Sequence, residues 1–261
     1  MTYKNILLEK KDRVAKITLN RPSAMNALDF DTVTELADAI NDIDKDGETR
    51  AVIITGSGRA FCAGADLAYV QSEIKNPIKM SAFLHGLKDV LCQMERMAQP
   101  FIVAINGFAL AGGLELVLAC DIVMIAEDAK IGDQHANYGL LPGGGGSQRL
   151  PRKIPLNKAK ELLLTGDWLT PQEAEKLGLV NRVVPPDKLQ DEAMKLALQL
   201  AEKSPVATKT VKHLMNKGVE LELDSALELE IGAMLTHFHT EDVREGLAAF
   251  LAKRKPEFKG K

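Results

Sequence analysis

A short buried strand that runs into a loop of small residues occurs twice in this chain, and this repeat constrains the fold most strongly. The first copy is AVIITG at residues 51–56, followed by SGRAFCAGADL, and the second is FIVAI at residues 101–105, followed by NGFALAGG. Short, wholly apolar runs bounded by turn residues are typical of buried strands. Helical patterns follow both loops, and a recurring order of strand, strand and helix predicts an α/β fold.

Hydrophobic periodicity predicts the elements around this repeat. Alternation in residues 5–8 and 14–19, joined by a charged turn, indicates a β-hairpin. Two helices with apolar side chains on one face are predicted at residues 29–45 and 78–97. A segment rich in loops is expected at residues 57–77. The C-terminal part of the chain is expected to be nearly all helical, over residues 187–203, 205–217, 220–239 and 241–254.

The composition is that of an ordinary globular chain. Of its 261 residues, 46% are hydrophobic and 26% are charged, which permits a sizeable core in one medium domain with a helical appendage. We place the boundary between a core at residues 1–200 and appended helices at residues 201–261. The net charge of −3 provides no field that attracts nucleic acid or an anionic membrane.

The sequence also bears on location and metal binding. No apolar run reaches the length of a membrane span, and the opening MTYKNILLEKKDR does not have the pattern of a signal peptide. Three cysteines lack the spacing of a disulfide framework, and no cluster of His, Cys, Asp or Glu has metal-ligand spacing. We therefore expect a cytoplasmic protein without a metal site.

Glu115 is the leading candidate for a functional side chain. It lies between two leucines in a short apolar helix that begins near Gly112. Burying an acid among apolar side chains is costly unless the acid is satisfied or used, and N–H groups at a helix start favour a developing negative charge. The loop at residues 57–67 also exposes its backbone, so each loop is able to direct one N–H at a single carbonyl oxygen. This pattern predicts an oxyanion-stabilising site beside a carboxylate.

Three motifs resemble the crotonase (enoyl-CoA hydratase/isomerase) superfamily in their order and spacing. They are FCAGADL at residues 61–67, INGFALAGGLELVLACDI at residues 105–122 and LLPGGGGSQRLPR at residues 140–152. The resemblance covers nearly the whole chain. It implies an α/β fold of the ββα superhelix type with a C-terminal helical oligomerisation region, in trimers that often pair into hexamers. It also implies an acyl-CoA thioester as substrate, with no permanently bound cofactor.

The resemblance assigns roles to single residues. The oxyanion hole is implied to consist of the backbone N–H groups of Ala65 and Gly112. Lys253 matches a lysine near the CoA phosphates of an adjacent subunit. The adenine and pantetheine of coenzyme A are implied to lie along a run of small and polar residues: Ala63, Gly64, Asp66 and Leu67.

The chain departs from the family pattern at one catalytic position. Hydratases of this superfamily use two glutamates; Glu115 matches the first, and His135 stands at the second. An imidazole is able to act as acid or base near neutral pH, so the site gives and takes protons differently from a site with two glutamates. Asp133 and Asn137 flank the ring, and either is placed to hold a water molecule or to orient it. The run Gly143–Gly146 is interpreted as close packing and a flexible pocket wall, because glycine-rich runs alone are weak evidence for phosphate binding.

The leading hypothesis is a hydro-lyase of fatty acid metabolism that adds water to an enoyl-CoA or removes it from a 3-hydroxyacyl-CoA. In this hypothesis Glu115 activates the water, and His135 positions that water or assists protonation. Double-bond isomerisation by one carboxylate is the main alternative; hydrolysis, decarboxylation and non-catalytic acyl-CoA binding are further alternatives. RNA binding, which one branch of the superfamily shows, is not expected because residues 29–46 are strongly acidic.

Overall fold

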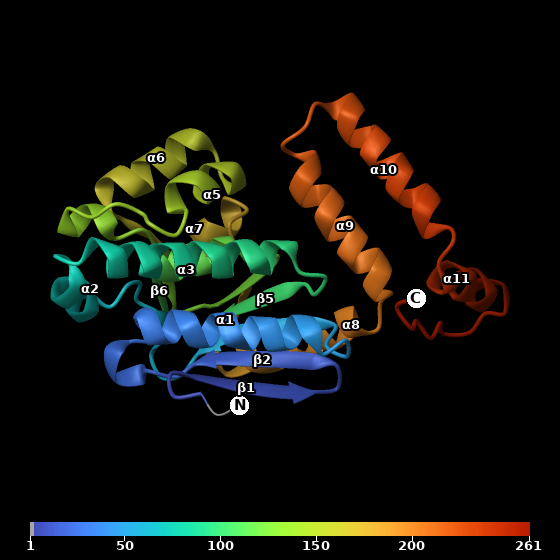
Figure 1. Cartoon of the computed structure of the whole chain (residues 1–261), viewed down its shortest axis with the longest axis horizontal. Helices are drawn as coiled ribbons and strands as arrows, with labels where there is room; N and C mark the ends of the chain where they lie inside the picture. The colour runs from blue at the N-terminus through green and yellow to red at the C-terminus, as the bar shows by residue number, and fades with distance from the viewer. Residues whose placement is uncertain (1–2) are drawn as a thin grey trace.

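The computed structural model describes residues 3–261 and is built around a six-stranded sheet (Figure 1). The first two strands form the antiparallel hairpin expected from the sequence, and each later strand runs parallel to its neighbour. The inner strands are buried, which explains their apolar sequences. In order across the sheet, the strands are β1 (Ile6–Lys11), β2 (Val14–Leu19), β3 (Ala51–Gly56), β5 (Phe101–Ile105), β7 (Ile122–Ala126) and β10 (Arg182–Val184).

A second sheet has four short strands. The chain passes from β3 to β4, from β5 to β6 and from β7 to β8 without an intervening helix, so it alternates between the two sheets. Helical structure follows each of these strand pairs, and the predicted ββα repeat and α/β class are therefore confirmed. The strands of the small sheet, in order, are β4 (Ala60–Cys62), β6 (Phe108–Leu110), β8 (Lys130–Gly132) and β9 (Trp168–Leu169).

Helices cover the sheets and continue to the C-terminus. Helices α1 and α3 lie side by side (Figure 1), and α8 packs across β3, β5 and β7. Within residues 3–261, no helix combines the length and apolar character needed to cross a membrane. The helices are α1 (Phe30–Lys45), α2 (Leu67–Glu73), α3 (Pro77–Arg96), α4 (Gly112–Leu118), α5 (Gly146–Lys153), α6 (Leu156–Thr165), α7 (Pro171–Lys176), α8 (Leu189–Ala201), α9 (Pro205–Gly218), α10 (Leu223–His237) and α11 (Glu241–Leu251), with short 3-10 turns η1 (Pro22–Ala24), η2 (His135–Tyr138) and η3 (Pro186–Lys188).

Local side-chain caps determine where several helices begin. Before α1, the Asp29 carboxylate accepts a hydrogen bond from the Thr32 N–H at 2.8 Å. Before α7, Thr170 and Glu173 form a reciprocal capping box. Such caps satisfy N–H groups that would otherwise lack a partner and typically stabilise a helix by about 1 kcal/mol.

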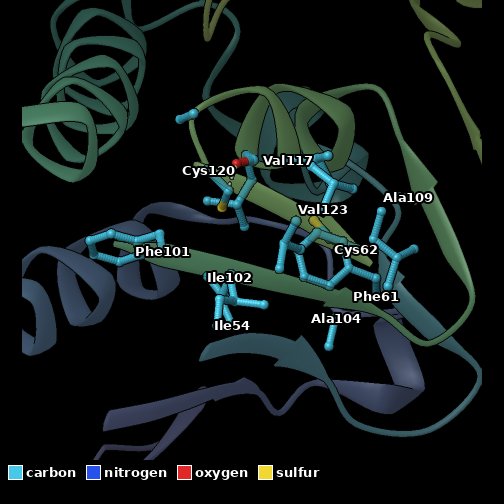
Figure 2. Close-up of a cluster of buried hydrophobic side chains, with 14 of the residues drawn as sticks. Ile54, Phe61, Cys62, Phe101, Ile102, Ala104, Ala109, Val117, Cys120 and Val123 are labelled. Atoms are coloured by element: carbon cyan, nitrogen blue, oxygen red, sulfur yellow. Dashed lines mark hydrogen bonds between the residues drawn. The ribbon is translucent and has the colours of Figure 1, made fainter. Parts of the chain in front are cut away.

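A buried cluster joins both sheets to α4 (Figure 2). Ile54 and Ile102 come from the large sheet, Phe61 comes from β4, and Val117 comes from α4. All four side chains are fully shielded from solvent. Because β4 and α4 pack on the same close-packed core, the loops at their ends are held in a fixed relation.

The segment at residues 57–77 contains more regular structure than the sequence suggested, and the expectation of a loop-rich segment is wrong for much of it. Strand β4 has three residues and pairs with β6, which is remote in sequence. Helix α2 is capped by Asp66, whose carboxylate accepts hydrogen bonds from the Ala68 and Tyr69 N–H groups. Elements this short, stabilised by a remote partner or by one cap, leave little periodicity in the sequence.

The C-terminal helices α9, α10 and α11 extend away from the sheets (Figure 1). Helix α9 is tied to the core by Lys212, whose ammonium group donates to Asp121 Oδ2 at 2.7 Å and to the carbonyls of Met94 and Gln99. Asp121 also accepts from the Phe101 N–H. Large apolar side chains on these helices remain exposed, among them Val211, Met215, Leu223, Leu227, Ile231, Met234, Leu235, Leu247, Phe250 and Leu251.

Candidate active site

Two backbone segments meet at the centre of the candidate site: the loop after β4 and the start of α4. The position that a Cβ would take on Gly64 is 2.8 Å from the Ala111 Cβ and 3.1 Å from the Gly112 nitrogen. A Cβ on Gly112 would in turn lie 3.4 Å from the Ala65 nitrogen. Gly64 has a φ of +102°, which favours glycine, so the backbone angle and the close contact both require glycine there.

The N–H groups of Ala65 and Gly112 are free to bind a ligand. Leu28 fixes the chain around Ala65, because its N–H donates to the Gly64 carbonyl and its own carbonyl accepts from the Asp66 N–H, each at 2.8 Å. Within residues 3–261, neither the Ala65 nor the Gly112 N–H donates a hydrogen bond. Gly112 opens α4, where N–H groups lack an intrahelical partner and favour negative charge. Two such donors are able to bind one carbonyl oxygen as it becomes negative.

Glu115 lies on the same helix, and only 1% of its surface is exposed. Its Oε1 accepts hydrogen bonds from the N–H groups of Gly144 and Gly146, both at 2.8 Å. Its Oε2 accepts none from residues 3–261 and still reaches solvent. One oxygen is therefore fixed by the backbone, while the other is available to a substrate or a water molecule.

Burial raises the pKa of Glu115, and it outweighs the Gly146 amide, the charge of His135 and the Gly144 amide, which lower this pKa. A carboxylate with a raised pKa is a stronger base once it is ionised. The site therefore equips Glu115 to take a proton.

His135 begins η2 and is held by Asp133, which is completely buried. The imidazole Nδ1 lies 3.0 Å from Oδ1 and 2.9 Å from Oδ2 of Asp133, and the His135 backbone N–H donates to Oδ1 at 3.0 Å. The Nε2 atom bonds to nothing within residues 3–261 and reaches solvent. Burial lowers the pKa of His135, but the hydrogen bond and charge of Asp133 and the charge of Glu115 outweigh burial and raise this pKa.

The two acid–base groups interact across Gly146. A Cβ on Gly146 would lie 3.3 Å from Glu115 Oε1 and 3.4 Å from Asp133 Oδ2, so the two carboxylates flank this glycine. The charge of His135 lowers the pKa of Glu115, and the charge of Glu115 raises that of His135. The arrangement leaves one carboxylate oxygen and one imidazole nitrogen open, which is a pair able to give and take protons.

Arg149 of α5 holds the glycine loop that fixes Glu115. Its Nη1 donates to the Gly144 carbonyl at 2.7 Å, and its Nε donates to Glu95 Oε1 at 2.6 Å. Charge-assisted hydrogen bonds of this kind are short and strong. The loop is thereby tied to Glu95 on α3, which limits how far the Gly144 amide can move.

The residues predicted to contact CoA lie in two separate places. Helix α11, which Lys253 follows, lies at the opposite end of the molecule from α2 (Figure 1), so the predicted CoA contacts are not gathered in one place. The Asp66 carboxylate is engaged within the chain, because it caps α2 and pairs with Arg21 Nη2 at 2.8 Å. The loop that carries Ala65 also contains Ala63, Gly64 and Asp66, and Leu67 follows it as the first residue of α2.

The sequence does not reveal the partners of Glu115, and it leaves two candidates for the partner of His135. The glycine run was interpreted only as packing and a flexible wall, yet the amides of Gly144 and Gly146 bind Glu115. Of the two polar neighbours considered for His135, Asp133 binds the ring, whereas the Asn137 side chain donates to Gln134 and to a backbone carbonyl in a neighbouring turn. Glycine has no side chain to reveal such a role, and the spacing to His135 is two residues for both Asp133 and Asn137, so it does not choose between them.

Comparison with known proteins decides the family. Residues 9–261 match the family described as enoyl-CoA hydratase/isomerase. The chain belongs to the enoyl-CoA hydratase/isomerase family. This family member is 42% identical over 261 residues to the crotonyl-CoA hydratase of Syntrophomonas wolfei, with 99% of each chain covered. It is 39% identical to the short-chain-enoyl-CoA hydratase of Clostridium acetobutylicum, with 98% of each chain covered.

The fold of this hydratase/isomerase family member agrees with solved structures. The crystal structure of an enoyl-CoA hydratase from Bacillus anthracis matches it with a TM-score of 0.95 and 39% sequence identity, covering 99% of this chain and 100% of the other. Both the predicted crotonase-type fold and the assignment to an enzyme family of the hydro-lyase type are confirmed.

Proposed function

We propose that this enzyme adds water across the double bond of an enoyl-CoA thioester. The observation that carries the proposal is the Glu115 carboxylate, with Oε1 fixed by two amides and Oε2 without a hydrogen-bond partner among residues 3–261. It lies three residues after Gly112 in α4, and residues at this spacing share one helix face. Relatives similar along their whole length are named crotonyl-CoA hydratase and short-chain-enoyl-CoA hydratase, which supports a short acyl chain as substrate.

In this proposal the thioester carbonyl binds between the N–H groups of Ala65 and Gly112. Attack of water at the β-carbon moves electrons onto the carbonyl oxygen, which becomes the oxygen of an enolate. The two N–H groups stabilise that charge without rearranging, because Leu28 and the start of α4 already hold them in place. One such donor typically contributes about 3–4 kcal/mol to transition-state stability.

Glu115 and His135 divide the proton transfers. The water oxygen bonds to the β-carbon while one water proton passes to Oε2 of Glu115. The enolate then collapses, and its α-carbon takes a proton from Nε2 of the protonated His135 ring. The site finishes with Glu115 protonated and His135 neutral, and solvent returns the proton from one group to the other. Dehydration of a 3-hydroxyacyl-CoA follows the same steps in reverse.

The coenzyme A part of the substrate is proposed to follow the loop after β4, along Ala63, Gly64, Asp66 and Leu67. Lys253 is proposed to reach the CoA phosphates of a neighbouring subunit, because α11, which it follows, lies at the other end of the molecule from α2 (Figure 1). We infer that residues 201–261 form the trimer or hexamer interface around a core at residues 1–200. The exposed apolar side chains of α9, α10 and α11 support this inference, since large apolar patches mark protein interfaces.

The proposed reaction requires proton transfer and oxyanion stabilisation alone, so coenzyme A enters as part of the substrate and no further cofactor is invoked. Residues 3–261 contain no group of three or more His, Cys, Asp or Glu side chains arranged to hold a metal ion. The free thiols of Cys62, Cys92 and Cys120 support the proposal of a reducing, cytoplasmic location.

A substrate panel tests the proposed function. The full chain is incubated with linear and cyclic enoyl-CoAs, beginning with crotonyl-CoA, while the absorbance of the conjugated thioester and the product masses are recorded. We expect a product heavier by one water molecule from wild type. In Glu115→Gln we expect a rate lower by about 10²–10⁴-fold, the usual contribution of a general base.

The alternatives give distinct products in the same assay. A product of unchanged mass with a shifted double bond would replace hydration by isomerisation, and release of free coenzyme A would indicate hydrolysis. Loss of carbon dioxide would indicate a decarboxylase. Saturable binding of every acyl-CoA without turnover would make the protein a binding protein.

A further inference from the structure

We propose that Asp133 is the positioning residue of His135: it sets the tautomer of the ring and directs Nε2 toward the reacting carbon. The inference rests on the proposed function and extends it to a residue that does not touch the substrate. Asp133 is completely buried, whereas the His135 side chain keeps 10% of its surface exposed. Both Asp133 oxygens lie within hydrogen-bond distance of Nδ1, so the ring is held from its inner side.

The chemistry of a carboxylate fixes the tautomer. An ionised carboxylate only accepts hydrogen bonds, so the Nδ1 atom that faces Asp133 must carry a proton. The other nitrogen, Nε2, is then the atom that gains and loses the working proton. The bond from the His135 backbone N–H to Asp133 Oδ1 anchors the same carboxylate a second time, which restricts the orientation of the ring.

The Asp133–His135 pair also balances the charge of the site. When the ring is protonated, the pair is neutral, and it is therefore a proton donor that adds no net charge beside the ionised Glu115. The carboxylates of Glu115 and Asp133 flank Gly146, and the charge of Asp133 raises the pKa of Glu115. The imidazolium offsets them, so an acid and a base coexist in one buried site.

Few other charges act on the ring. Helix α6 packs on η2, and its Lys158 pairs with Glu161. On α5, Arg149 pairs with Glu95. The charges that shift the pKa of His135 are those of Asp133 and Glu115, so replacing Asp133 should change the titration of this ring in a defined direction.

Nuclear magnetic resonance of the free enzyme tests the pairing directly. The five histidines are labelled with ¹⁵N, and His135 is assigned from the signal that disappears in His135→Gln. We expect the wild-type ring to titrate above its ordinary pKa of 6.5 and to carry its proton on Nδ1 when neutral. In Asp133→Asn the midpoint should move to lower pH. This readout needs no substrate, so it distinguishes failure of the pairing from failure of the hydration proposal.

The pH dependence of hydration tests the consequence for catalysis. The proposed mechanism needs ionised Glu115 and protonated His135. We therefore expect kcat/KM to fall at low pH, where Glu115 gains a proton, and at high pH, where His135 loses its proton. In Asp133→Asn the alkaline limb should shift to lower pH while the acid limb changes less. We expect kcat to fall by about 10²–10³-fold, within the usual range for a displaced general acid, with KM changed little.

Two comparisons separate positioning from mere structural support. Asp242→Asn is the matched control, because Asp242 is also a buried carboxylate that accepts backbone N–H groups, and it lies in α11. We expect it to lower the melting temperature without moving the pH profile. The double variant Asp133→Asn/His135→Gln should be no slower than His135→Gln alone, because Asp133 acts through the ring.

Three results would overturn the inference. The first is a loss of rate in the double variant equal to the product of the two single losses. The second is an alkaline limb of the pH profile of kcat/KM that does not move in Asp133→Asn. The third is a neutral wild-type ring that carries its proton on Nε2. If Asp133→Asn does not fold, the titration and tautomer of wild-type His135 still decide, since a midpoint below 6.5 contradicts the pairing.

Discussion

Gly144→Ala tests whether the position of the Glu115 carboxylate limits the rate. A Cβ on Gly144 would lie 2.7 Å from Glu115 Oε2 and 3.1 Å from Leu87 Cδ2. Real Cβ contacts below 3.0 Å essentially do not occur, so the carboxylate or the glycine loop has to move by several tenths of an ångström. Gly144 does not have a positive φ, so the new methyl group strains no backbone angle. The substitution therefore displaces the carboxylate while leaving the Gly144 N–H in the chain.

The expected loss follows from that displacement. Misplacing a reacting group by about 1 Å costs roughly 10²-fold in rate, so a smaller shift predicts a kcat lower by about 10–100-fold. This is equivalent to about 1.4–2.7 kcal/mol of barrier, with little change in KM. Initial rates of enoyl-CoA hydration give both constants, measured where thermal melting shows the variant folded.

Gly232→Ala is the matched control for Gly144→Ala. It adds the same methyl group in α10, where nothing in the same chain lies within 4 Å, and we expect full activity when the oligomeric state measured in solution is that of wild type. If Gly144→Ala kept full kcat, the position of the carboxylate would not limit the reaction, and the geometric argument for Glu115 as the base would fail.

Three further predictions concern buried charges and thiols. Glu115→Gln should lose activity but melt at the same or a higher temperature than wild type at neutral pH. Burial raises the pKa of this carboxyl, and the neutral amide avoids the cost of burying an ionised carboxylate. A large loss of stability would show a structural role instead. Lys212→Met should lower the free energy of unfolding in urea by about 3 kcal/mol, because it leaves Asp121 without its ammonium partner; an unchanged midpoint would contradict this. Burial raises the pKa of the Cys62 thiol to about 12 and raises that of Cys120 as well. A thiol reagent at mildly alkaline pH should therefore react with both thiols only after denaturation. Rapid reaction of these thiols in the native protein would refute the burial argument.

Local pattern was sufficient to predict the main elements and the central catalytic candidate. The strand at residues 101–105 and the short helix around Glu115 are visible because each is a nearly continuous apolar run next to glycines or other turn residues. The strands β4 and β9 are too short to show a period, and each is stabilised by a partner that is distant in sequence. Such pairings are set by tertiary packing, which a single sequence does not display.

The candidate site also contains one part that the sequence predicts and one part that it does not. Glu115 and His135 were found from residue type and from the family motifs, since their chemistry is carried by side chains. The bonds from the Gly144 and Gly146 amides to Glu115 were not found, because they join residues about thirty positions apart through backbone atoms. The choice of Asp133 over Asn137 as the partner of the ring depends on the local turn of the chain, which the spacing alone leaves undetermined.

The most direct test of the hydration mechanism is the origin of the atoms in the product. Crotonyl-CoA is converted in water that carries heavy oxygen and deuterium, and the product is analysed by mass spectrometry. We predict one heavy oxygen and one deuterium on carbon with wild type, slower gain of both with His135→Ala, and neither with Glu115→Gln. Deuterium uptake or double-bond movement without oxygen gain in wild type would contradict hydration and make isomerisation the working reaction.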